Sequence, residues 1–122
     1  MRPLVLVMCA AAGLVAGCGS TSPVAYCNNF QTELCARVWE CTDAMNEATA
    51  DFQMAWGASP TDCATMMKAA NCATATNDRP CGSRDLTYHA DKADACVADL
   101  KAASCSTVLA GFVSDNCLAV CS

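Results

Sequence analysis

Cysteine is the residue that most constrains what this chain can fold into, because 12 of its 122 residues are Cys. Such a density is typical of small domains held together by disulfides. Bulky apolar side chains are few, and the sequence contains no Ile. The hydrophobic core is therefore expected to be thin, and crosslinks, at about 2–4 kcal/mol each, have to supply much of the stability. Disulfides persist in oxidising compartments, so this prediction requires export.

The N-terminus has the layout of a secretory signal. Arg2 supplies a positive charge, and the run from Leu4 to Val15 is uncharged and apolar. This run is shorter than the roughly 20 residues that cross a bilayer. Residues 14–18, Leu-Val-Ala-Gly-Cys, resemble the bacterial lipobox, which implies cleavage before Cys18 and acylation of that cysteine. The alternative is an ordinary cleaved signal, with Cys18 in a disulfide.

Three segments follow from this interpretation: a lipoprotein signal peptide at 1–17, an acylated Cys18 with a short tether at 18–24, and a disulfide-stabilised helical domain at 25–122. Two or more acyl chains hold a protein stably on a membrane, whereas one does so marginally. Gly19, in place of the Asp that retains such proteins at the inner membrane, resembles the pattern of outer-membrane lipoproteins. The expected location is the outer membrane, on its periplasmic face or at the cell surface.

The cysteines left for the domain are even in number. Cys9 leaves with the signal and Cys18 carries lipid, and ten remain. They are Cys27, Cys35, Cys41, Cys63, Cys72, Cys81, Cys96, Cys105, Cys117 and Cys121. An even set in an exported chain predicts five disulfides. The acidic balance, 12 Asp and Glu against 7 Lys and Arg, argues against nucleic acid as a partner.

Helical periodicity predicts an all-α fold of about four helices without a sheet. The clearest helix spans 24–41, where Cys27, Phe30, Leu34, Val38 and Cys41 form an apolar stripe expected to face the main core. Cys35 and Trp39 lie on one flank of the stripe, which predicts a second neighbouring helix there. Further helices are expected at 44–56, ended by a left-handed Gly57, at 60–70 after a Ser59 cap, and at 88–103. A short apolar piece, 108–113, and the pair Cys117 and Cys121, on one face if helical, complete the chain.

Residues 63–72 align without gaps to residues 96–105, and both read Cys, eight residues, Cys, with a shared Lys-Ala-Ala. We interpret them as duplicated crosslinked helices, with the second capped within 91–94; chance similarity in an Ala-rich chain is the alternative. Cysteines nine apart face opposite sides of a continuous helix. Either each helix packs between two neighbours, or its second cysteine lies beyond the end of the helix. Asn71 and Ser104 favour the second alternative.

Together, Cys27, the segments 34–41 and 56–63, and the two Cys-x8-Cys segments resemble small cysteine-rich lipoproteins of myxobacteria and related bacteria. The resemblance covers nearly the whole chain and consists of cysteine spacings and helix starts. It implies an envelope location and a helical architecture, and it implies no active-site residue.

Catalytic and metal-binding patterns are weak. Zinc needs close thiolate pairs with further ligands, and only Cys117 and Cys121 have such spacing. The single histidine, His89, would need a reduced thiol to act as a base, so we expect an exposed helical residue near Asp85 and Asp91. The acids Asp91, Asp94 and Asp99 are expected on a solvated helix face. The sequence therefore predicts no catalytic residue, no metal and no cofactor.

The expected function is that of a non-enzymatic, lipid-anchored envelope lipoprotein, acting as a structural or protein-interaction module. The alternative is a helical carrier for a small apolar ligand. Met45, Met54, Met66 and Met67 could line a groove with nearby aromatic residues, although their spacing favours ordinary core. A cavity of about 300 Å³ or more would favour the carrier, and a core filled by Phe30, Leu34, Phe52, Trp56 and Leu100 the module.

Overall fold

The computed structural model describes residues 21–78, 81–82 and 85–122. In these ranges the fold is all-α, as predicted, and no strand is present apart from one isolated bridge between Tyr88 and Cys121. The helices are α2 (Pro23–Cys41), α3 (Ala44–Glu47), α4 (Ala50–Trp56), α5 (Pro60–Asn71), α6 (Ala90–Ala102), α7 (Cys105–Leu109) and α8 (Asp115–Leu118). The predicted signal, Cys18 and Gly19 lie outside the described residues.

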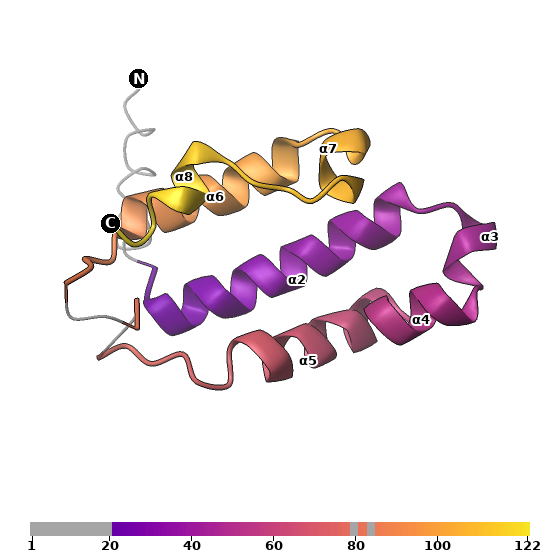
Figure 1. The fold of residues 1–122 in the computed structure, drawn as a ribbon, viewed down its shortest axis with the longest axis horizontal. Coiled ribbons are helices and arrows are strands. Elements are labelled where there is room, and N and C mark those ends of the chain that lie inside the picture. Colours follow the sequence, from indigo (N-terminus) through magenta and orange to yellow (C-terminus); the bar gives the residue numbers. More distant parts are fainter. Residues whose placement is uncertain (1–20, 79–80, 83–84) are drawn as a thin grey trace, which may run out of the picture.

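The central element is α2, which lies between α5 on one side and α6 on the other (Figure 1). It begins one residue before the predicted boundary because Ser22 caps it, accepting a hydrogen bond from the Ala25 amide at 3.2 Å, and Pro23 occupies its first turn. It ends at Cys41, as predicted. None of the described helices is long and apolar enough to span a bilayer.

Two disulfides fasten α5 to α2. Cys63 near the start of α5 bonds Cys35 in the middle of α2, and Cys72 at the end of α5 bonds Cys27 near the start of α2. Because the later cysteine of α5 meets the earlier cysteine of α2, the two helices run antiparallel. The predicted second neighbour on the Cys35 flank is therefore α5, whose Cys63 and Ala64 are buried with Cys35 against Trp39.

The opposite side of α2 is covered by α6, which runs parallel to it. The Tyr26 hydroxyl and the Cys96 sulfur lie 3.3 Å apart at one end, and a disulfide joins Cys41 to Cys105 just beyond the other end. Between these points Leu100 is fully buried against Val38. The prediction that Cys27 and Cys41 face one core is thus wrong for Cys27, which crosslinks to the end of α5.

The single helix predicted over 44–56 is two helices. Asp43 caps α3 by accepting from the amides of Met45 and Asn46, and Thr49 caps α4 by accepting from the Phe52 amide at 3.2 Å. A Thr side chain that bonds a nearby backbone amide competes with helix continuation, so the chain restarts at Ala50.

The turn between α4 and α5 matches its prediction. Gly57 ends α4 with φ of 76°, and a Cβ added there would lie 2.8 Å from the backbone nitrogen of Cys63. Ser59 then caps α5, accepting from the Asp62 amide at 3.1 Å. Only glycine suits this position, because both its left-handed conformation and its close backbone contact exclude a side chain.

The start of α6 differs from the prediction. The helix begins at Ala90, and His89 occupies the cap position without a side-chain hydrogen bond, so the expected cap within 91–94 is wrong. Tyr88 instead pairs antiparallel with Cys121, flanked by backbone hydrogen bonds between Thr87 and Ser122. Since α8 ends at Leu118, Cys121 lies outside it and does not share a helix face with Cys117.

Candidate functional site

All ten predicted disulfide cysteines are paired in the structure. The pairs are Cys27–Cys72, Cys35–Cys63, Cys41–Cys105, Cys81–Cys121 and Cys96–Cys117. Their Cα separations of 4.6–5.8 Å lie in the normal range for disulfides. Both helix-end cysteines of the repeat, Cys72 and Cys105, lie beyond the last residue of their helix, as the sequence favoured. These ten cysteines therefore have a structural role, as disulfides.

Two groups of titratable residues differ from their predictions. His89 is half-buried at the cap position of α6, with its amide donating to the Val120 carbonyl at 2.9 Å, and is not an exposed helical residue. Asp94 accepts from the Thr21 hydroxyl, and Asp99 accepts from the Asn116 amide at 3.0 Å. The hydrogen bonds from Asn116 and Ser114 hold the pKa of Asp99 below its usual value.

Asp94 and Asp99 therefore form tertiary contacts and are half-buried, whereas Asp91 is exposed. Among the residues that the structure describes, no three His, Cys, Asp or Glu side chains are arranged as metal ligands.

The principal concave site is an apolar groove of about 410 Å³. Its lining residues come from α2 and the residue after it, from α4, and from α7 and the residues after it. In Figure 1, α4 and α7 lie at the same end of the molecule, on either side of α2. Its lining consists of Phe30, Leu34, Val38, Thr42, Phe52, Trp56, Val108, Leu109, Gly111 and Phe112. No lining residue carries a charge, and this set is hereafter called the groove.

The groove exists because α2 has more apolar surface than its two neighbours cover. Its Cys35 and Trp39 flank faces α5, and its Arg37 flank reaches the residues after α6. Leu34 and Val38 lie between these flanks and form the floor. The face of α2 that points away from the groove carries the exposed residues Asn29, Thr32, Ala36 and Glu40.

Aromatic packing builds the α4 wall. The rings of Trp39 and Phe52 meet edge to face, with centroids 5.1 Å apart, and the Trp39 indole donates to the Trp56 carbonyl at 3.2 Å. Phe52 and Trp56 are one helical turn apart and so both line the groove. The only hydroxyl among the lining residues, that of Thr42, donates to the Val38 carbonyl at 2.7 Å. The Trp39 indole and the Thr42 hydroxyl thus both donate to backbone carbonyl groups.

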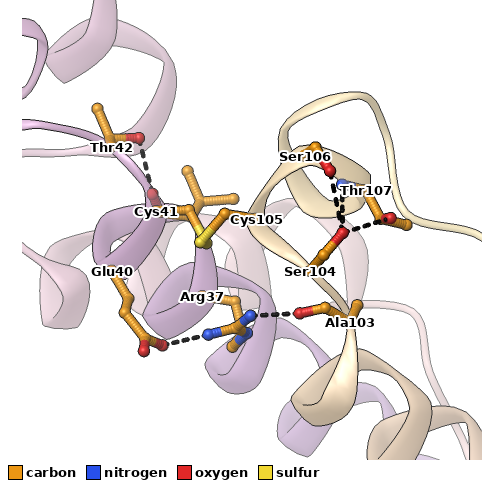
Figure 2. Close-up of a disulfide and its surroundings, with 10 residues drawn as sticks. Arg37, Glu40, Cys41, Thr42, Ala103, Ser104, Cys105, Ser106 and Thr107 are labelled. Atoms are coloured by element: carbon orange, nitrogen blue, oxygen red, sulfur yellow. Dashed lines mark hydrogen bonds and ion pairs between the residues drawn. A yellow bond between two sulfur atoms is a disulfide. The ribbon is translucent and has the colours of Figure 1, made fainter.

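The α7 wall is held by the Cys41–Cys105 disulfide (Figure 2). Beside it, Arg37 donates to the Ala103 carbonyl and to Glu40, and Ser104 caps α7 by accepting from the Thr107 amide. These contacts fix the position of Val108, Leu109 and Phe112 over α2. The wall is therefore preorganised by a covalent bond and by a charged hydrogen bond to the backbone.

The methionines do not form the core that their spacing predicted. Met45, Met54 and Met66 are 84%, 78% and 43% exposed, and only Met67 packs against the buried Cys35–Cys63 cluster. The groove is lined by aromatic and aliphatic residues instead. Of the five residues predicted to fill a core, Leu100 is fully buried. The other four, Phe30, Leu34, Phe52 and Trp56, are partly buried against the cluster that contains Leu100 and also line the groove.

The α7 part of the site was not predicted from the sequence. The sequence shows residues 108–113 as a short apolar segment, but no sequence feature indicates that this segment lies across the groove from α4. Leu109 and Val113 are 55% and 63% exposed, so the apolar surface extends from the groove onto this segment.

Acidic residues predominate in the segments that carry the groove, apart from Arg37, which is paired with Glu40 and the Ala103 carbonyl. From residue 38 to residue 67 the sequence contains five acids and no Lys or Arg, and from 102 to 122 it contains Asp115 alone. Asp43 directly follows the lining residue Thr42, and Asp51 directly precedes Phe52. The Asn46 side chain and backbone hold the pKa of Asp43 below its usual value through hydrogen bonds. The Asp43 carboxylate is therefore ionised at neutral pH.

No family model matches the chain, and no similar protein was found among curated sequences or solved structures.

Proposed function

We propose that this chain is a lipid-anchored binding module of the cell envelope, without enzymatic activity, that takes an apolar group into the groove. In this proposal Cys18 carries the lipid, as in the myxobacterial cysteine-rich lipoproteins that the sequence resembles, and residues 25–122 form the exposed domain. The outer membrane is the proposed location. The single observation that carries the binding role is the groove of about 410 Å³.

The character of the lining supports binding of apolar groups. Small-molecule and side-chain sites are concave and lined mainly by hydrophobic and aromatic residues, as this one is. Transfer of apolar surface into such a site is favourable by about 25 cal/mol per Å². Because a disulfide holds the α7 wall and aromatic packing holds the α4 wall, the ligand would not have to order them, which preserves more of that free energy for binding.

Two occupants fit this proposal. The volume exceeds the 300 Å³ that the sequence analysis set for a carrier, which supports a small apolar ligand. The exposed Leu109 and Val113 beside the groove support a protein partner, because apolar surface outside a pocket is typical of an interaction site. Both occupants use the same floor and walls.

The test of the groove is binding of a neutral, environment-sensitive dye such as Nile red. The exported, oxidised chain carrying Cys18→Ser is used, so that no lipid competes. We expect dye emission to rise and shift to the blue, and Leu109→Asp to weaken binding at least tenfold, because a carboxylate enters an apolar wall. The matched control is Leu118→Asp, another exposed leucine, on α8 and outside the groove. Equal binding by both variants would contradict the proposal.

The anchor is tested separately. Cys18→Ser removes the only proposed site of lipid attachment, so the chain is expected in the soluble fraction of envelope preparations, whereas the unaltered chain sediments with membranes. Membrane retention of the Cys18→Ser chain would contradict the proposed acylation.

A further inference from the structure

The two borders of the groove differ in chemistry. Residues 43–51, which connect the lining residues Thr42 and Phe52 through α3 and the start of α4, carry Asp43, Glu47 and Asp51, four residues apart, and no basic residue. We call this segment the α3–α4 border. The other border, residues 102–114, which include α7, contains no charged residue and exposes Leu109 and Val113; the nearby Arg37 guanidinium is bonded to the Ala103 carbonyl. An occupant therefore meets apolar surface in the middle and along one edge, and negative charge along the other.

Basic side chains near this end of the molecule are already engaged. Arg37 donates to Glu40 and to the Ala103 carbonyl, and Lys101 lies 3.9 Å from Glu33. An anionic ligand, such as a fatty acid, would thus meet the acidic border without a counter-charge. Coulomb attraction instead favours an occupant with positive charge on one side of an apolar stripe.

The length of the groove fits a helix. Its α2 floor extends from Phe30 to Thr42, which corresponds to roughly 18 Å at about 1.5 Å per residue. About three turns of a partner helix have this length, and apolar side chains at positions i, i+3 or i+4, and i+7 would project along it. A compact small molecule would occupy only part of the floor.

We propose that the groove is the docking site for a cationic amphipathic helix of a partner protein, whose apolar side chains lie between α4 and α7 and whose Lys or Arg residues face Asp43, Glu47 and Asp51. This inference rests on the proposed binding function of the groove and adds the class of occupant. The crosslinked α7 wall receives the apolar side chains, and the α3–α4 border supplies charge complementarity.

The experiment uses three synthetic 15-residue peptides and the oxidised Cys18→Ser chain. One peptide has Leu at i, i+3, i+4 and i+7 positions with Lys elsewhere, the second has Glu in place of each Lys, and the third has the Leu–Lys composition in scrambled order. We expect the Leu–Lys helix to bind at least tenfold more tightly than the other two, with an affinity that falls as salt rises.

The charge contribution is isolated by a matched pair of variants. Asp43→Asn/Glu47→Gln/Asp51→Asn should weaken binding of the Leu–Lys helix about tenfold, since each exposed ion pair contributes modestly. Asn at position 43 retains a capping side chain for α3. The control, Asp78→Asn/Asp91→Asn/Asp115→Asn, changes the net charge equally at exposed sites outside the groove and should bind as the unaltered chain does.

The outcomes separate the inference from the function on which it rests. Equal binding of the Lys and Glu helices, or equal affinity of the two triple variants, would overturn the cationic partner. Dye binding without binding of any peptide would also overturn it and would indicate a small apolar ligand. If neither dye nor peptide binds, the proposed function itself fails.

Discussion

The two copies of the Cys-x8-Cys segment lie on opposite sides of α2 and are used in opposite ways. The first copy lies in α5 up to Asn71, with Cys72 just beyond it, and α5 runs antiparallel to α2. The second copy lies in α6 up to Ala102, with Cys105 beyond it, and α6 runs parallel to α2. The copies share their cysteines and Lys-Ala-Ala, yet these residues meet different parts of α2. The comparison shows that a repeated helix sequence does not dictate a repeated docking geometry.

Crosslinking follows from the direction of each helix. On the α5 side, both cysteines find partners on α2. On the α6 side only Cys105 does, because Cys96 arrives beside Tyr26 and bonds Cys117 of α8 instead. One side of α2 is therefore held by two covalent bonds, and the other by one such bond together with packing.

On the α6 side, side-chain packing compensates for having one disulfide to α2 where the α5 side has two. Leu100 occupies the repeat position of Met67, and it is fully buried between Val38 and Val108, whereas Met67 is half-buried. Both tyrosines of the chain, Tyr26 and Tyr88, also lie on the α6 side, with ring centroids 6.4 Å apart. The α6 side thus depends more on its core, and the α5 side more on sulfur.

The largest expected effect comes from Cys41→Ala/Cys105→Ala, which removes the only disulfide between α2 and the α6 side. Its cysteines are 64 residues apart. The free energy of unfolding should fall by about 4 kcal/mol, compared with about 3 kcal/mol for Cys27→Ala/Cys72→Ala, because Cys35–Cys63 still shortens that loop. Urea denaturation measures both losses.

Hydrogen exchange locates the damage. In the Cys41→Ala/Cys105→Ala variant we expect amides of α6 and α7 to exchange faster while those of α5 stay protected. Uniform loss of protection on both sides of α2 would contradict the proposed division between packing and crosslinks.

A smaller effect is expected from Leu100→Ala, which should lower the free energy of unfolding by about 3 kcal/mol through lost burial and a cavity. The matched change at the repeat position, Met67→Ala, should lower it by about 1 kcal/mol, because that side chain is only half-buried. Equal losses in thermal or urea denaturation would show that the two sides have equivalent cores.

The smallest effect concerns alkaline pH. Burial, and then the charges of Asp94 and Tyr26, raise the pKa of Tyr88 to about 12 from its ordinary value of 10. The folded state therefore favours the neutral phenol, which donates to the Thr21 carbonyl at 2.9 Å. Its contribution to stability is complete below pH 10 and is lost as the pH rises from 10 to 12.

Ultraviolet absorbance of tyrosinate and circular dichroism, recorded together on brief alkaline exposure, check this prediction. Tyr88→Phe should remove the part of the stability loss between pH 10 and 12 that belongs to Tyr88. If Tyr88 instead ionises near pH 10 while the helices remain intact, the proposed burial of its phenol is wrong.

Much of the fold followed from local pattern. The apolar stripe of α2, the Ser59 cap and the left-handed Gly57 are short-range features, and the structure confirms them, except that Cys27 of the stripe faces α5. The helix break at Thr49 was missed because the hydrogen bond from the Phe52 amide to the Thr49 side chain outweighs the helical spacing of the apolar residues. The helix start after His89 was missed because the bridge between Tyr88 and Cys121 holds the preceding residue outside the helix. The floor and the α4 wall of the groove were recognised as apolar residues but were expected to be covered.

By itself, the sequence determined that the chain is helical, that its ten domain cysteines form an even set, and where α2, α3 and α5 begin, α2 to within one residue. These properties depend on side chains within one or two turns of each other. Only the tertiary structure decided which cysteines pair, that α5 and α6 run in opposite directions, and that α7 closes one wall of an open groove. The physical reason is that ten cysteines allow about 945 pairings, and the choice depends on which helices pack together, which is a property of contacts distant in the chain.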